Sequence, residues 1–298
     1  MSTWRKQKKS YKSVPAAAVV KEYRLAIIGI WILHILTVPA AAFLIWRGIS
    51  GQTILVNGIF EAIVALFANY LIRVLKTLKL NQVNRILTFD CDPVKYEAIF
   101  RPIRDGGWKA PVYTLNIARA LYYQGNWEDA KKELEKISMK PGKSLFYLQC
   151  QNLMVGCLES EGDLDRIIKI REQVKKQVVS AKEKSNFAAN GRQLLNIIDG
   201  ALAFRRKNVT RAREIYEDLY DNATFTLSRI TALWKLAQLD QLTGANYTAS
   251  DRCDYIIDAG GTTFYVKEAE VLLDRCCKRV PKPESESEPE EEVEDGAE

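Results

Sequence analysis

The chain has almost no histidine: His34 is the only one among its 298 residues. Zinc sites and many general acid–base sites draw on histidine, so its scarcity argues against both. The sequence also contains no Walker phosphate-binding loop and no G-x-S-x-G motif. We therefore expect that the protein is not an enzyme and that it uses neither a metal nor a cofactor.

Cysteine is present but is not arranged as a metal or redox site would need. The six cysteines show no C-x-x-C spacing, and the only histidine that could join the adjacent pair Cys276–Cys277 lies in a long apolar stretch. In a reducing compartment we expect buried or free thiols. The cysteines are Cys91, Cys150, Cys157, Cys253, Cys276 and Cys277.

Charge is nearly absent from two stretches close to the N-terminus. Residues 25–46 carry no full charge, and residues 53–75 carry only Glu61 and, near the end, Arg73. About 20 apolar residues in a helix cross a hydrocarbon core, and residues 47–52 leave room only for a tight turn. The pattern predicts a two-helix transmembrane hairpin in the lipid bilayer. The first stretch is too long for the apolar part of a cleaved signal peptide.

Basic residues flank both ends of this hairpin. Residues 1–24 carry seven Lys and Arg against one acid, residues 73–85 carry four against none, and the turn offers only Arg47. Because Lys and Arg concentrate on the cytoplasmic side, we expect an integral plasma- or inner-membrane protein with both termini cytoplasmic. We divide this part into a basic arm, residues 1–24, that touches anionic lipid headgroups, and a hairpin region, residues 25–77.

Basic residues are absent from the other end of the chain, where residues 284–298 hold nine acidic residues. Such a segment buries too little apolar surface to fold, so residues 281–298 are predicted to form a disordered acidic tail. The tail either keeps the protein soluble or competes with an acidic partner for the basic middle of the chain.

No useful run of alternating polar and apolar residues occurs between residues 78 and 280. Apolar residues recur there at intervals of three and four, and Gly and Pro fall between the segments. The pattern predicts an all-α domain. Two segments, residues 114–137 and 233–256, share a small residue in the first helix (Ala118, Ala237), a turn glycine (Gly125, Gly244) and an alanine in the second helix.

This helix–turn–helix pattern resembles the tetratricopeptide repeat. Two further copies are degenerate: one keeps its small residues but has Lys207–Asn208 at the turn, and the other keeps the turn glycine Gly162 but has Ile167 in the second helix. The second-helix positions are spaced by 37, 45 and 37 residues, which is longer than the usual 34. The residues predicted to pack helix against helix are Ala118, Gly125, Ala130, Gly200, Ala212, Ala237, Gly244 and Ala249.

The resemblance covers about residues 90–278, and the whole chain looks like a bacterial membrane-anchored tetratricopeptide protein. It implies a helical solenoid over residues 78–280 that presents its concave face to a protein or peptide partner. Nucleic acid is not expected as a partner, because basic side chains on repeat helices are usually only solvated. The candidate concave residues are Asn116, Arg119, Tyr123, Lys235 and Gln238.

An alternative places the function inside the membrane. A carboxylate or histidine within a span is costly and often functional, so Glu61 and His34 are candidates for an ion- or proton-linked role, with the repeats regulatory; helix packing is the plainer interpretation. Two spans cannot enclose a pathway, so this function would need a homo-oligomer formed through the hairpin. The small residues of Gly58-x-x-x-Ala62 offer a face for such packing.

Overall fold

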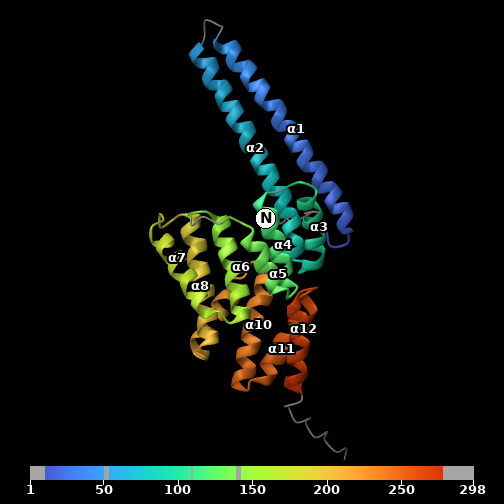
Figure 1. The fold of residues 1–298 in the computed structure, drawn as a ribbon, viewed down its shortest axis with the longest axis vertical. Helices are drawn as coiled ribbons and strands as arrows, with labels where there is room; N and C mark the ends of the chain where they lie inside the picture. The colour runs from blue at the N-terminus through green and yellow to red at the C-terminus, as the bar shows by residue number, and fades with distance from the viewer. Residues whose placement is uncertain (1–10, 50–53, 109, 139–141, 278–298) are drawn as a thin grey trace, which may run out of the picture.

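The computed structural model describes residues 11–49, 54–108, 110–138 and 142–277. Within these ranges the chain forms twelve helices and no strand (Figure 1), which confirms the all-α prediction. The predicted tail, residues 281–298, lies outside the described residues. The helices are α1 (Ala16–Ile49), α2 (Ile54–Thr88), α3 (Pro93–Asp105), α4 (Pro111–Tyr123), α5 (Trp127–Glu135), α6 (Leu145–Glu161), α7 (Leu164–Val179), α8 (Asn186–Arg205), α9 (Val209–Asp221), α10 (Thr226–Thr243), α11 (Asn246–Ala259) and α12 (Phe264–Cys277).

Helices α1 and α2 pack along one another, and their far ends stand clear of the other helices (Figure 1). Large apolar side chains on this pair stay exposed, among them Trp46 at 66% and Leu66 at 71%. In the described part of the chain, no helix combines the length and the apolar character needed to cross a membrane. The side chains of His34 and Glu61 lie outside the described part. The transmembrane hairpin therefore stays a prediction.

The near end of the hairpin is built into the helical core. Tyr11, Val19 and Tyr23 are buried and pack with residues of α3 and α4 in one apolar cluster. Glu22 accepts a hydrogen bond from the Tyr11 hydroxyl and pairs with Lys79 of α2, each at 2.8 Å. Residues 11–24, which we expected in a basic arm, thus pack against the domain, because apolar side chains recur on one face of the first turns of α1.

Four helical hairpins follow α3: α4–α5, α6–α7, α8–α9 and α10–α11. Gly125, Gly162 and Gly244 end their first helices with φ between 80° and 87°, a left-handed conformation that glycine adopts without a side-chain clash. In α8–α9 this role falls to Lys207, with φ of 58°. Asn208 then caps α9 by accepting the backbone N–H of Arg211.

Small side chains lie where the paired helices meet. Ala118, Ala130, Ala212, Ala237 and Ala249 are all 0% exposed. A Cβ placed on Gly200 would lie 2.9 Å from Cγ2 of Ile215 on the paired helix α9. Helices that approach this closely tolerate only small residues at the crossing.

The end of the helical array returns to its beginning. Ahead of α12, the backbone N–H of Thr262 donates to the carbonyl of Cys91 at 3.0 Å, and its hydroxyl donates to Asp92 at 2.9 Å. Phe264 then packs edge-on against Trp127, with ring centroids 5.6 Å apart. Helix α10 also contacts the end of α2, where the Phe89 and Phe225 rings are 5.4 Å apart. The array therefore closes on itself, whereas an open solenoid would keep its ends apart.

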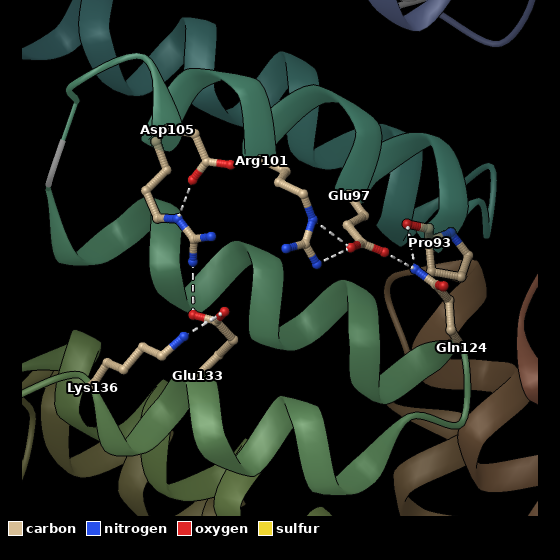
Figure 2. Close-up of polar contacts among 8 residues, drawn as sticks. Pro93, Glu97, Arg101, Asp105, Gln124, Glu133 and Lys136 are labelled. Carbon is tan, nitrogen blue, oxygen red and sulfur yellow. Dashed lines mark hydrogen bonds and ion pairs between the residues drawn. The ribbon is translucent and has the colours of Figure 1, made fainter.

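Polar side chains fix α3 to the first hairpin (Figure 2). Glu97 pairs with Arg101 on α3 and accepts a hydrogen bond at 2.7 Å from Gln124 at the end of α4. Glu133 of α5 pairs with Arg104 of α3 at 2.7 Å and with Lys136 at 2.9 Å. These contacts hold the end of α4, and with it Tyr122 and Tyr123, in a fixed position relative to α3.

Candidate functional site

The inner helices of the closed array surround a cavity of about 280 Å³. Helices α6, α8 and α10 and the segment between α9 and α10 supply most of its walls, while α4 and α12 close it on one side. The lining combines aromatic rings with side-chain amides and hydroxyls. The lining residues include Tyr122, Asn152, Gly156, Glu159, Gln193, Tyr216, Ser228, Lys235 and Tyr265.

One buried ion pair lies in this cavity. The Lys235 ammonium of α10 lies 2.5 Å from the Glu159 carboxylate of α6, with only 18% and 11% of the two side chains exposed. Lys235 also lies 4.7 Å above the centre of the Phe204 ring. Arg205 of α8 donates a hydrogen bond to the backbone carbonyl of Glu159. Two cations and one carboxylate therefore meet where α6, α8 and α10 converge.

Tyrosine hydroxyls form the second polar element of the cavity. Burial raises the pKa of Tyr122, Tyr216 and Tyr265, and the nearby Glu159 carboxylate raises the pKa of all three further. Since an unperturbed tyrosine has a pKa near 10, these phenols stay protonated at neutral pH. They can therefore donate hydrogen bonds to a ligand, and they cannot act as bases.

A glycine makes room for one of these rings. A Cβ on Gly156 of α6 would lie 2.7 Å from the hydroxyl oxygen and from Cζ of Tyr122. The Tyr122 ring is also packed against Tyr123 and Phe264, with centroids 5.0 Å and 6.3 Å away. The ring is therefore held in one orientation, and the cavity wall is preformed.

The structure brings only part of the predicted concave face together. Tyr123 and Lys235 line the cavity, whereas Asn116, Arg119 and Gln238 are not among its lining residues. Asn116 is 2% exposed, and neither its amide nitrogen nor the amide oxygen of Gln238 has a hydrogen-bond partner among the described residues. Asn116 is therefore buried within the array, and Arg119 and Gln238 are half-buried.

The sequence reasoning missed most of the residues that define the cavity. Asn152, Gly156 and Glu159 are spaced by four and three residues, so they lie on one face of α6. The available signal was a carboxylate on the same face as a glycine, in a helix that is otherwise largely apolar. Tyr265 gave no signal, because it follows the last predicted repeat and reaches the cavity only through ring closure.

A second buried carboxylate was also missed. Asp240 of α10 is 1% exposed and pairs with Arg213 of α9 at 2.6 Å and with Arg252 of α11 at 2.8 Å. It ties three consecutive helices together and lies outside the cavity lining. We assign it to the stability of the array.

The cysteines are not gathered into a reactive site. The five whose side chains are described are buried. Burial raises the pKa of Cys150 to about 11 and that of Cys91, Cys157 and Cys253 to about 12. In the described ranges, no three His, Cys, Asp or Glu side chains converge as metal ligands would.

Comparisons with known proteins do not assign this site. No protein-family model matches the chain, and searches of curated proteins and of solved structures find no match either. The function must therefore be argued from the geometry alone.

Proposed function

We propose that this protein is a membrane-anchored binding module that recognises a protein or peptide partner with the cavity inside its helical array. The observation that carries the proposal is the cavity itself, which is preformed, lined by both aromatic and polar groups, and built from residues of six helices. Its volume of about 280 Å³ falls just below the range of about 300–1,000 Å³ of small-molecule sites. It suits one or two side chains of a partner segment better than a whole cofactor.

The chemistry of the cavity favours a segment that has both an aromatic or aliphatic side chain and polar backbone groups. The rings of Tyr122, Tyr216 and Tyr265 offer apolar walls with hydroxyl donors, and Asn152 and Gln193 offer amides that pair with a peptide backbone. Tyrosine-rich surfaces of this kind provide much contact area at a low cost in side-chain entropy.

Anchoring in a bilayer accounts for the exposed apolar side chains of α1 and α2. Leu25, Ile35, Phe43, Ile63 and Leu66 are each at least 57% exposed on a helical pair that projects from the domain (Figure 1). On a soluble protein, a large exposed apolar surface marks a site of contact with a partner or with lipid. The basic flanks identified in the sequence favour an orientation with both termini in the cytoplasm.

The binding proposal is tested with a photoreactive residue placed at Gln193, which lines the cavity and is exposed. In cells, we expect a crosslinked partner from this position and none from Lys175 on the outer helix α7. Ser228→Trp should fill the cavity mouth and abolish the crosslink, while Thr248→Trp, at an exposed position of α11, should preserve it. Equal crosslinking in both tryptophan variants would contradict the proposal.

The anchoring proposal has its own test. A reporter that is active only outside the cytoplasm should be silent when fused after Glu298 and active when inserted at Gly51. The opposite pattern would show that the hairpin has the reverse orientation, and silence at both positions would show that it does not cross the membrane.

A further inference from the structure

A second cavity lies where the hairpin joins the helical array. Its volume is about 520 Å³, and it is separate from the cavity inside the array because the two share no lining residue. One wall comes from α1 and α2 and the other from Gly107, Trp108, Ala110 and the start of α4. The lining residues include Tyr23, Ile27, Trp31, Lys76, Leu80 and Trp108. We call this cavity the junction groove.

One cation without an acidic partner among the described residues, Lys76, lines the junction groove, and three more lie on the same two helices. In the described part of the chain, no ion pair is formed by Lys21, Arg24, Arg73 or Lys76, whereas the neighbouring Lys79 pairs with Glu22 at 2.8 Å. The Lys76 ammonium lies 4.5 Å above the centre of the Trp31 ring. Arg24 donates one hydrogen bond to the carbonyl of Pro102 at 2.5 Å, and its buried Nε has no partner. The groove therefore carries positive charge that no described carboxylate neutralises.

Apolar side chains continue from the groove along the hairpin. Ile28 and Ile32 of α1 and Leu71 and Leu75 of α2 are between 42% and 53% exposed. They lie within about two helical turns of Trp31 or Lys76, which is about 11 Å along a helix. A ligand that fits this surface has an anionic group next to a long apolar chain. A soluble phosphate would leave the apolar part of the surface uncovered.

We propose that the junction groove holds an anionic phospholipid, with its phosphate between Lys76 and Arg24 and an acyl chain along Ile27 and Trp31. The inference rests on the proposed anchoring of the hairpin in a bilayer, because only then do these residues meet lipid. Tryptophan and lysine side chains are typical of the level of the headgroups, and each cation near an anionic membrane strengthens its binding about fivefold.

The test measures which lipid stays with the full chain. The protein is purified from nanodiscs that contain phosphatidylglycerol and phosphatidylcholine in equal amounts, and retained lipid is identified by native mass spectrometry. We expect phosphatidylglycerol to be retained selectively. Lys76→Gln should lower its retention about fivefold, and the double variant with Arg24→Gln about thirtyfold. Lys175→Gln with Lys176→Gln, a matched charge change on exposed residues of α7, should have no effect.

Lys76→Gln keeps every hydrogen bond and ion pair described above, so it is the variant that remains informative if the double variant is unstable. Equal retention of both lipids, or unchanged retention in Lys76→Gln, would overturn the inference. So would displacement of the lipid by soluble glycerol phosphate, which would show that the apolar part of the groove contributes nothing. Alkaline extraction of membranes separates the two proposals: protein that stays embedded but shows no lipid selectivity refutes the groove and leaves the anchor standing.

Discussion

Removal of the charge on Asp240 should destabilise the last part of the helical array. Asp240 is 1% exposed, and its two oxygens lie 2.6 Å and 2.8 Å from guanidinium nitrogens of Arg213 and Arg252. Asp240→Asn preserves the shape of the side chain but leaves two arginines without their anion. Breaking a fully buried pair costs about 3–5 kcal/mol.

Partial exposure of the arginines reduces this cost. The Arg213 and Arg252 side chains are 29% and 20% exposed, so water takes over part of the lost interaction. We expect the free energy of unfolding to fall by about 2–4 kcal/mol, and the melting temperature to fall by about 5–15 °C. The measurement is urea and thermal unfolding of the full chain in detergent, followed by far-ultraviolet circular dichroism.

Asp258→Asn is the matched control, because Asp258 is exposed on α11 and forms no ion pair among the described residues. It should change the stability by less than about 0.5 kcal/mol. If Asp240→Asn were as stable as this control, the desolvation of Asp240 would cancel its attraction to both arginines, and the stabilising role assigned to this carboxylate would be wrong.

Three further predictions concern packing and protonation. Gly156→Ala should lower the free energy of unfolding by about 1–3 kcal/mol, because its Cβ would lie 2.7 Å from the Tyr122 ring. Gly29→Ala is the control and should cost nothing, because no atom lies within 4 Å of its Cβ. Equal unfolding curves for the two variants would show that the Tyr122 ring moves freely. Ala130→Leu should also cost about 1–3 kcal/mol in urea unfolding, since Ala130 is 0% exposed, and an unchanged midpoint would mean that the α4–α5 contact is loose. In a Cys277→Ser background at pH 8, the four thiols with raised pKa should resist maleimide until the chain unfolds, and prompt labelling of the folded chain would contradict their burial.

The sign of the thiol effect also predicts how stability depends on pH. A raised pKa means that the folded state holds the proton more tightly than the unfolded state does. The contribution of the buried thiols to the stability of the folded state is therefore complete below the ordinary thiol pKa of about 8.5. It is lost as the pH rises toward the folded values of about 11 to about 12. Replacing Cys157 with Ala should therefore flatten the loss of stability between these limits.

Local features of this chain were predictable because neighbouring residues determine them. Apolar residues at intervals of three and four place helices over residues 114–123 and 127–137, and Gly125, Gly162 and Gly244 end helices because their backbone turns left-handed. The degenerate turn was placed correctly at Lys207–Asn208, where the lysine adopts the left-handed conformation. The start of α1 was misjudged, since a basic composition concealed the apolar face that buries Val19 and Tyr23.

The sequence by itself determined the helices, their turns, the small residues at the crossings and the apolar hairpin, because each depends on contacts within a few residues along the chain. Only the tertiary structure decided that the array closes, since closure depends on the rotation accumulated over four hairpins and brings Thr262 to Cys91. Closure in turn adds Tyr265 to the wall of the cavity. Tertiary packing also places Glu159 of α6 beside Lys235 of α10 and buries Asn116, none of which neighbouring residues along the chain determine.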